Sequence, residues 1–311
     1  MNKQRIAILG IGAVGGYIGA LLAEKYSGSD VEIIFIAREK TANIIRKNGL
    51  KLITPSGEKI VHPYIVSNDP REIGPIDFLI CCIKSYDIEE SILPLQGCIG
   101  DKTVIIPLLN GVDAKERIEK ILPGTEVWDG CVYIVSRIIE PGVIKETGNV
   151  HVFYFGSDTA EKNRLEQFHR MLLNGGVDGR LSENIMKTNW EKFIFISPGA
   201  SATSYFDKSI GAVLAEPESR KMLENLLAEI KAIADKKGIT FDFDVIESTL
   251  TKMKSLPFET TSSMHSDFQK GGKTELRSLT AYVVEEGKRS GTVTTTYEKV
   301  LKALKEKQID I

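Results

Sequence analysis

The chain has few of the residues that build metal centres. Its 311 residues include only four histidines and four cysteines. No Cys-x-x-Cys pair and no His-x-x-x-His pair occurs, and the histidines, His62, His151, His169 and His265, are scattered along the chain. Structural and catalytic zinc sites place such ligands at short, regular spacings. The sequence therefore predicts no metal site.

The cysteines also do not suggest a disulfide framework. Cys81 and Cys82 are adjacent in an apolar run, so on a strand their side chains point to opposite faces. Cys98 and Cys131 stand alone. We interpret these cysteines as small core residues.

Long apolar runs and an excess of charge are absent as well. No apolar run reaches the roughly 18 residues that a membrane-spanning helix needs. The formal net charge is −2 and the isoelectric point is near 6.2, so the chain lacks the basic field that attracts nucleic acid or anionic lipid. The sequence enters an apolar strand pattern without a signal peptide. We expect a cytoplasmic protein whose partner is a small molecule.

A glycine-rich motif follows the first apolar run, residues 6–9. It reads Gly10-Ile11-Gly12-Ala13-Val14-Gly15 and leads into an apolar helical pattern. In such a strand–turn–helix the first glycine permits the sharp turn, the second lets backbone approach a pyrophosphate, and the third lets the helix pack closely. The helix N-terminus adds free N–H groups and a positive dipole end. The motif predicts a dinucleotide-binding unit whose cofactor contacts include Gly10, Gly12, Ala13, Val14 and Gly15.

The tip of the second predicted strand indicates which dinucleotide binds. NAD-preferring units usually carry an acid there, roughly 20 residues after the glycines. Here the tip is Ala37, followed by Arg38, Glu39 and Lys40. Arginine can bind a 2′-phosphate through a bidentate fork, which favours NADP(H). The alternative is a solvated loop in which Glu39 interrupts the basic patch.

The chain divides into two regions of different character. Strand and helix patterns alternate up to residue 181, and the runs 78–83 and 103–109 are apolar enough for strands covered on both faces. Other elements expected in this region are a helix at 40–47, a hairpin of 50–54 with 59–66, β-rich structure over 127–155, a helix at 161–173 and a strand at 177–181. Long helical patterns follow, at 184–202, 218–237, 244–255, 275–290 and 295–307. We predict an α/β fold with an N-terminal Rossmann-type domain over 1–181 and an all-helical domain over 182–311.

Three residues are candidates for catalysis. Asn110 follows a predicted buried strand, where its amide could meet the nicotinamide end of the cofactor, although Asn-Gly is also a common turn pair. Lys192 lies in the apolar stretch 189–196, where desolvation would suit it to general-acid work, although it could also snorkel to the surface. Glu275 opens a predicted helix, where an acid also complements the dipole.

These residues belong to a set of motifs that resembles the ketopantoate reductases, the NADPH-dependent 2-dehydropantoate 2-reductases of pantothenate synthesis. The resemblance spans essentially the whole chain. Besides the glycine motif and Arg38, it includes Ile83-Lys84, Leu109-Asn110-Gly111, Trp190-Glu191-Lys192, the Ser-Ser-Met-x-x-Asp run within 261–267, and Lys273-Thr274-Glu275.

The resemblance implies a role for each matching residue. Lys192 takes the position of the general acid, and Asn110 that of the active-site asparagine. Ser263 takes the position that contacts the substrate carboxylate, and Glu275 the one that engages substrate and lysine. Two basic residues align with those near the adenosine 2′-phosphate, namely Arg38 and Lys84.

Two positions depart from the family pattern. Characterised members carry asparagines four and eight residues after the lysine, and these line the substrate pocket. Here the positions hold Ile196 and Ala200, on the same helical face as Lys192. We interpret them as substrate-binding positions. Alternatively, Pro198 turns them into the helical core, because proline removes a backbone N–H and can kink the helix.

The sequence therefore predicts an NADPH-dependent reductase of a 2-oxo acid, with 2-dehydropantoate as the first candidate substrate. The two apolar positions beside Lys192 leave the exact 2-oxo acid open. One alternative is a reductase of another carbonyl or imine on the same scaffold. Another is an NADP(H)-sensing protein without turnover, which the joint presence of Asn110, Lys192, Ser263 and Glu275 disfavours. The number of subunits is not determined, and a homodimer stays open.

Overall fold

The computed structural model describes residues 3–309, which fall into two compact units. The first comprises the described residues through Leu109 together with Ala114–Ile185, and the second comprises Asn110–Asp113 and the described residues from Met186 onward. The sequence prediction places segment 110–113 in the first domain, whereas the structure assigns it to the second unit. The reason is packing, because Val112 contacts the apolar core of that unit and Asp113 accepts a hydrogen bond from Ser278.

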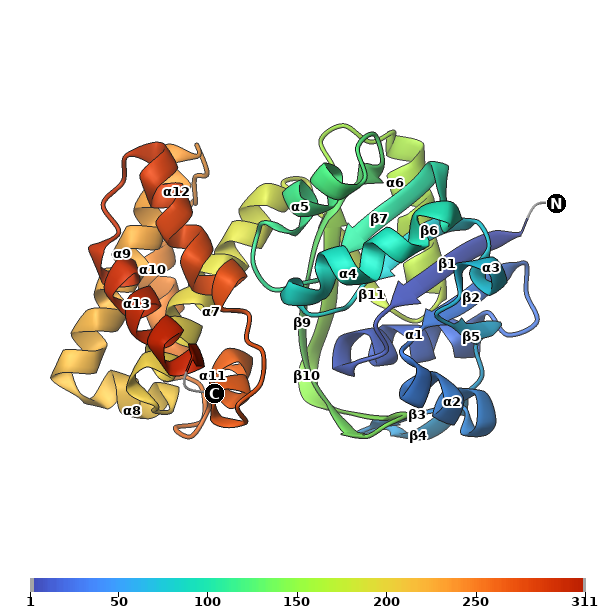
Figure 1. Ribbon diagram of the computed structural model, residues 1–311, viewed down its shortest axis with the longest axis horizontal. Coiled ribbons are helices and arrows are strands. Elements are labelled where there is room, and N and C mark those ends of the chain that lie inside the picture. Colours follow the sequence, from blue (N-terminus) through green and yellow to red (C-terminus); the bar gives the residue numbers. More distant parts are fainter. Residues whose placement is uncertain (1–2, 310–311) are drawn as a thin grey trace. The chain divides into compact units, whose positions relative to one another are not determined.

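A six-stranded parallel sheet forms the centre of the first unit (Figure 1). Its strands lie in the order β5-β2-β1-β6-β7-β8. Their bounds are β1 Gln4–Leu9, β2 Val31–Ile36, β5 Ile65–Ser67, β6 Ile76–Cys81, β7 Ile99–Pro107 and β8 Glu126–Val127. Counted along the chain, the order is 3-2-1-4-5-6, that of a doubly wound dinucleotide-binding sheet. The predicted Rossmann-type fold is confirmed.

Alternate residues of the central strand enter two separate apolar cores. Ile6 and Ile8 belong to one core, and Ala7 and Leu9 to the other. Because successive side chains of a strand point to opposite faces, the sheet is covered on both sides. This double burial explains the near-continuous apolar runs in the sequence. It also gives the turn after β1 a rigid base.

A second sheet of five strands completes the first unit. Its strands are β3 Leu50–Thr54, β4 Gly57–Val61, β9 Asp129–Glu140, β10 Val143–Gly156 and β11 Asp178–Leu181. The order is β11-β10-β3-β4, and β9 pairs with β10 as a long antiparallel hairpin. The predicted strand 59–66 is wrong as a single element, because β5 pairs with β2 in the main sheet. Pro63 lies between β4 and β5 and has no N–H to donate to a ladder.

Helices cover both faces of the main sheet. Their bounds are α1 Ala13–Lys25, α2 Glu39–Asn48, α3 Pro70–Ile73, α4 Ile88–Ile92, α5 Ala114–Ile121 and α6 Lys162–Asn174, with 3-10 turns η1 Ser85–Asp87 and η2 Leu93–Cys98. Helices α3, α4 and α5 contribute to the core that contains Ala7. Helices α1 and α6 contribute to the other core, which also includes Phe153 and Phe155 of the second sheet. These two helices therefore pack between the two sheets.

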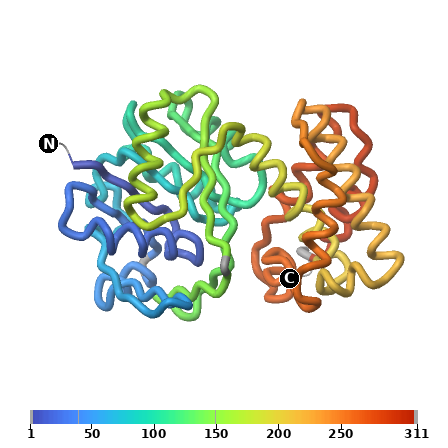
Figure 2. The backbone as a smooth tube through the Cα atoms, turned by 180° about the vertical axis from the view of Figure 1, so that it is seen from behind, coloured from blue at the N-terminus to red at the C-terminus, as the bar shows by residue number. Residues whose placement is uncertain are grey.

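The second unit consists of helices around one apolar core (Figure 2). Its elements are α7 Ile185–Phe206, α8 Ile210–Ala215, α9 Pro217–Lys236, α10 Val245–Lys254, α11 Ser263–Gln269, the π-helical turn η3 Arg277–Ala281, α12 Tyr282–Ser290 and α13 Thr295–Ile309. Across residues 3–309, no helix combines the length and the apolar character that crossing a membrane requires.

Local capping chemistry sets several of these helix ends. Asp244 precedes α10, and its Oδ1 accepts the backbone N–H groups of Ile246 and Glu247, each at 3.0 Å. Gly291 ends α12 in the left-handed conformation, with φ of +68°. The short helices α8 and α11 are absent from the sequence prediction, because six or seven residues give too little periodicity. The predicted helix 275–290 is wrong at its start, where the π-helical turn η3 precedes α12.

Candidate functional site

The glycine-rich turn joins β1 to α1 and combines tight packing with an open backbone. A Cβ on Gly15 would lie 2.1 Å from the carbonyl oxygen of Gly10, so only glycine fits there. A Cβ on Gly12 would meet no atom within 4 Å. Gly12 is also the N-cap of α1, and no side chain caps this helix. The turn thus offers free backbone N–H groups at the start of a 13-residue helix, which fits the phosphates of a dinucleotide.

Arg38 and Lys84 follow the two strands that flank β1. Arg38 directly precedes α2 after β2, and Lys84 directly precedes η1 after β6. Because β2 and β6 pair with opposite sides of β1, both residues come after strand ends next to the glycine-rich turn. The side chain of Arg38 is 78% exposed.

Asp87 is a member of this region that the sequence prediction missed. Its carboxylate forms an ion pair with the guanidinium of Arg38. A 2′-phosphate at Arg38 would have to compete with this carboxylate. The sequence did contain a signal for this acid, because Asp87 follows the predicted phosphate-binding residue Lys84 by only three positions.

Asn110, Lys192 and Glu275 lie together in the second unit. The Lys192 ammonium donates a hydrogen bond to Oδ1 of Asn110 at 3.4 Å, and Nδ2 of Asn110 donates one to Oε2 of Glu275 at 3.1 Å. The lysine and the glutamate are 8% and 2% exposed. A primary amide carries both a donor and an acceptor, so Asn110 can bridge a cation and an anion. The three predicted catalytic residues therefore form one chain of hydrogen bonds.

Each member of this chain comes from a different element. Asn110 belongs to segment 110–113, Lys192 to α7, and Glu275 to the residues just before η3. Buried charges are tolerated when they are paired and hydrogen-bonded, and their interactions are stronger than in water because the surroundings are less polar. The arrangement can direct the Lys192 ammonium through its hydrogen bond to Asn110.

Helix α7 continues past Lys192 through Pro198 to Phe206. Ile196, one turn after the lysine, is partly exposed and packs against the apolar core of the unit. Ala200 is only 3% exposed and is part of that core. The burial of Ala200 agrees with the alternative in which this position serves the core. Substrate contact at Ile196 and Ala200 stays a prediction.

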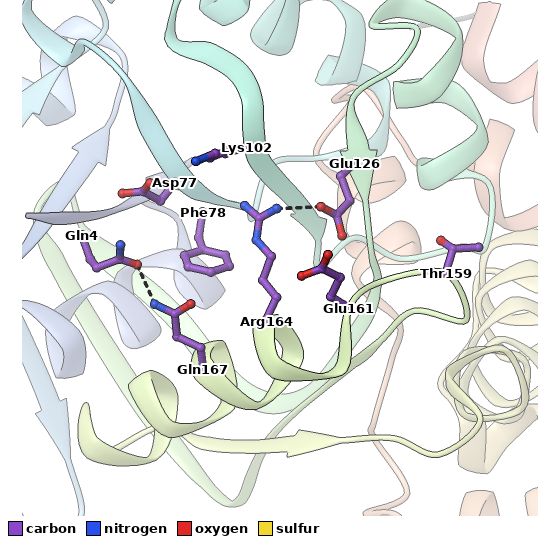
Figure 3. Close-up of a pocket in the computed structure, with 9 residues that line it drawn as sticks. All are labelled: Gln4, Asp77, Phe78, Lys102, Glu126, Thr159, Glu161, Arg164 and Gln167. Carbon is purple, nitrogen blue, oxygen red and sulfur yellow. Dashed lines mark hydrogen bonds and ion pairs between the residues drawn. The ribbon is translucent and has the colours of Figure 1, made fainter. Parts of the chain in front are cut away.

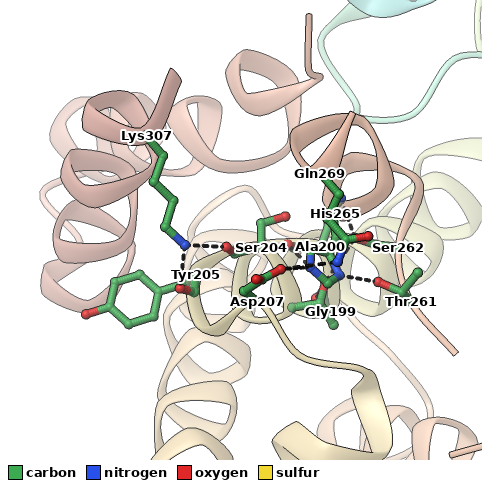
Figure 4. Close-up of polar contacts among 11 residues, drawn as sticks. Gly199, Ala200, Ser204, Tyr205, Asp207, Thr261, Ser262, His265, Gln269 and Lys307 are labelled. Atoms are coloured by element: carbon green, nitrogen blue, oxygen red, sulfur yellow. Dashed lines mark hydrogen bonds and ion pairs between the residues drawn. The ribbon is translucent and has the colours of Figure 1, made fainter. Parts of the chain in front are cut away.

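Ser263 is the first residue of α11, and its side chain is exposed. Its neighbours hold this short helix in place (Figure 4). Ser262 Oγ accepts the backbone N–H of His265 at 3.0 Å and lies 2.9 Å from the hydroxyl of Thr203 on α7. The imidazole Nε2 of buried His265 lies 2.7 Å from Oδ1 of Asp207, directly after α7, and this hydrogen bond lowers the pKa of Asp207. Ser263 thus sits on a helix start that is fastened to the end of α7.

A pocket in the first unit lies away from the predicted nucleotide turn. It is lined by Gln4, Asp77, Phe78, Lys102, Glu126, Thr159, Glu161, Arg164 and Gln167 (Figure 3). Gln4 and Glu126 are the first residues of β1 and β8, so the pocket is at the amino ends of the parallel strands. Doubly wound sheets bind their ligands beyond the carboxyl ends instead. Glu126 and Arg164 pair with each other at 2.8 Å, and no predicted site residue lines this pocket.

Known protein families match both units of the chain. Residues 6–158 match the family described as "Ketopantoate reductase PanE/ApbA", and residues 184–308 match "Ketopantoate reductase PanE/ApbA C terminal". An "uncharacterized oxidoreductase YkpB" of Bacillus subtilis (strain 168) is 30% identical over 298 residues, which is 96% of each chain. A 2-dehydropantoate 2-reductase of Halobacterium salinarum is 24% identical over 91% of each chain.

Solved structures agree over nearly the full length. The crystal structure of 2-dehydropantoate 2-reductase from Porphyromonas gingivalis W83 is 32% identical, with a TM-score of 0.84 over 97% of this chain and 99% of that one. The ternary structure of D-mandelate dehydrogenase with NADH and anilino(oxo)acetate is 21% identical, with a TM-score of 0.86 over 99% of both chains, and shows the shared fold. The chain is an oxidoreductase that belongs to the ketopantoate reductase family.

Proposed function

We propose that the protein reduces a 2-oxo acid to the corresponding 2-hydroxy acid with NADPH, and that 2-dehydropantoate is its first candidate substrate. The observation that carries this proposal is the hydrogen-bonded chain of Lys192, Asn110 and Glu275. It gives a buried ammonium a fixed direction, which a general acid for ketone reduction needs. A protein that only senses the nucleotide has no use for such a chain.

The nucleotide would be held by the first unit. Residues 12–15 would bind the pyrophosphate through backbone N–H groups, and Arg38 with Lys84 would bind the adenosine 2′-phosphate. Bound NADPH supplies the hydride that reduces the ketone carbon. The preference for NADPH over NADH depends on Arg38 being available, so Asp87 is expected to weaken that preference by holding the same guanidinium.

The proton-transfer role falls to Lys192. As negative charge develops on the ketone oxygen, the ammonium stabilises it and then donates a proton from Nζ to the alkoxide. Asn110 keeps the amine directed through its Oδ1, and Glu275 orients the amide from the other side through its Oε2. The family resemblance implies that this glutamate engages both the substrate and the lysine. Ser263 would bind the substrate carboxylate through its exposed hydroxyl.

The identity of the substrate depends on the α7 face beside Lys192. Family members with asparagines at positions 196 and 200 have amides available to a substrate hydroxyl, whereas Ile196 and Ala200 have none. A site that hydrogen-bonds a substrate hydroxyl can reject analogues lacking it by about 10⁴–10⁵, and an apolar site cannot. We therefore expect this enzyme to discriminate weakly between 2-dehydropantoate and plain 2-oxo acids of similar bulk.

The test is NADPH oxidation, followed by absorbance, with 2-dehydropantoate, plain 2-oxo acids, other carbonyls and imines. Turnover of 2-oxo acids above all other compounds is the expected result. Preferred turnover of a different carbonyl or of an imine would assign another substrate class to the same scaffold. Nucleotide binding without turnover of any compound would instead indicate a sensor.

A further inference from the structure

The π-helical turn η3, residues Arg277–Ala281, begins two residues after Glu275 and leads directly into α12. Such turns are rare inside α-helices and occur frequently at functional sites. They are held by contacts from outside the helix, because the wider turn is less favourable than a regular one. The contacts of η3 therefore indicate what the turn is for.

Three successive residues of η3 form buried polar contacts with other elements. Ser278 Oγ donates to Oδ2 of Asp113 at 3.0 Å. The carbonyl oxygen of Leu279 accepts a hydrogen bond from Ser197 Oγ at 2.6 Å. The hydroxyls of Thr280 and Ser201 lie 2.9 Å apart. The four hydroxyl side chains that make these contacts are each 0% exposed, and Asp113 is 6% exposed.

These contacts lead to the elements that carry the proposed catalytic residues. Asp113 lies three residues after Asn110 in segment 110–113. Ser197 and Ser201 lie on α7, five and nine residues after Lys192. The third catalytic residue, Glu275, precedes the turn by two residues. The turn thus contacts two of the elements that carry catalytic residues and is joined to the third by the chain itself.

The donor roles at Ser197 follow from the chemistry of its neighbours. Its hydroxyl has one hydrogen, which goes to the Leu279 carbonyl, since a carbonyl can only accept. The Tyr297 hydroxyl, 2.7 Å away, must then donate to Ser197. Burial raises the pKa of Tyr297, which keeps this donor protonated. Ser197 therefore uses its hydrogen and an acceptor site, and both contacts depend on direction as well as distance.

We propose that η3 is a positioning joint, and that Ser197, Ser201, Ser278 and Thr280 are positioning residues that set the register of Asn110, Lys192 and Glu275. The inference rests on the proposed function, because it assumes that these three residues perform the chemistry. Directional bonds suit this task better than apolar contacts, which would allow the elements to slide past one another. A displacement near 1 Å at a catalytic group can cost about 10²-fold in rate.

The test compares Ser197→Ala with a matched control, Ser219→Ala. Ser219 is also a buried serine of the helical unit whose Oγ donates to a backbone carbonyl, that of Val213 at 2.8 Å, but it joins α9 to α8. Both variants lose one buried hydroxyl, and Ser197→Ala should show the larger fall in Tm because it also leaves the Tyr297 hydroxyl without its acceptor. We expect Ser197→Ala to lower kcat by about tenfold or more, within the range that misplacement produces. Ser219→Ala should leave kcat unchanged, and the Kd for NADPH should be unchanged in both.

A second arm separates positioning from a merely structural role. In a Glu275→Gln background, Ser197→Ala should produce little further loss of kcat, because the group that it positions is already changed, while its effect on Tm should persist. If Ser197→Ala does not fold, Thr280→Val takes its place, since it removes the hydroxyl that contacts Ser201 at nearly constant volume.

The possible failures are distinguishable. Equal kcat values for Ser197→Ala and Ser219→Ala, with Glu275→Gln strongly impaired, would overturn the joint and leave the proposed function standing. If the kcat losses of Ser197→Ala and Glu275→Gln are fully additive in the double variant, the proposed positioning role of η3 would also be wrong. A Glu275→Gln variant with unchanged kcat would overturn the proposed catalytic chain, and the joint with it.

Discussion

Replacing Lys192 with alanine tests the proposed chemistry most directly. General-acid catalysis contributes about 10²–10⁴ in rate, which corresponds to about 2.7–5.4 kcal/mol of transition-state stabilisation at 1.36 kcal/mol per tenfold change. The variant also loses the 3.4 Å hydrogen bond to Asn110, and it leaves the buried Glu275 carboxylate without the cation at the other end of the hydrogen-bonded chain. Tm should therefore fall as well, because an uncompensated buried charge is destabilising. We expect kcat to fall by about 10²–10⁴ at a temperature where the melt shows the variant to be folded.

The assay is NADPH oxidation with the best 2-oxo acid, together with the Kd for NADPH and a thermal melt. The Kd should not change, because the glycine-rich turn belongs to the first unit and Lys192 to the second. Lys187→Ala is the matched control on α7, since that lysine pairs with exposed Asp242 and such surface pairs contribute about 0–1 kcal/mol. A loss of kcat below tenfold in Lys192→Ala, or an equal loss in the control, would refute the assignment.

Three further predictions concern the nucleotide, the α7 face and alkaline stability. Arg38→Ala should weaken NADPH binding by about 10- to 150-fold and leave NADH binding nearly unaffected, because only the 2′-phosphate loses a charge-assisted contact. Asp87→Asn should strengthen NADPH binding by up to about fivefold, which is the contribution of an exposed ion pair. Titration of each variant with both nucleotides measures these changes in Kd. Ile196→Asn should raise kcat/KM for 2-dehydropantoate relative to a plain 2-oxo acid with little change in Tm, whereas Ala200→Asn should lower Tm, since adding atoms to a packed core costs about 1–3 kcal/mol. Between about pH 10 and about pH 12, Tm should fall less in Tyr17→Phe than in the unchanged protein, as measured by thermal melts at each pH.

The alkaline prediction follows from the pKa of Tyr17. Burial, followed by the nearby charges of Glu146 and Asp178, raises this pKa from 10.0 to about 12. Between these pH values the unfolded chain releases the phenol proton and the folded chain keeps it. The free energy of unfolding therefore falls as the pH rises through this window. Identical pH dependence of Tm in Tyr17→Phe and the unchanged protein would contradict this account.

The predictions on the nucleotide and on the α7 face can each be contradicted by a specific result. Equal weakening of NADPH and NADH by Arg38→Ala would mean that Arg38 supports the fold or the adenine and not the 2′-phosphate. A large fall in Tm for Ile196→Asn with an unchanged substrate ratio would place that side chain in the core. Unchanged Tm for Ala200→Asn would show that the buried position has room for an amide.

The sequence by itself determined the elements whose causes are local. The glycine turn from Gly10 to Gly15, the doubly covered strands and the long helices were predicted because turn chemistry, alternation and helical periodicity are properties of neighbouring residues. The resemblance to a family assigned roles to Lys192 and Glu275 and added Lys84 and Ser263 as candidates. Short elements such as α8 and α11 escaped, since six or seven residues carry too little pattern.

The tertiary structure alone decided how distant segments combine. It assigned segment 110–113 to the helical unit, placed residues 65–67 in the main sheet, paired Arg38 with Asp87 and buried Ala200 in a core. It also put a π-helical turn where the periodicity of 275–290 predicts a regular helix. None of these features follows from the local conformational preference of its own segment. Each is stabilised by contacts with residues far along the chain, and a local sequence pattern does not indicate which distant segments will make contact.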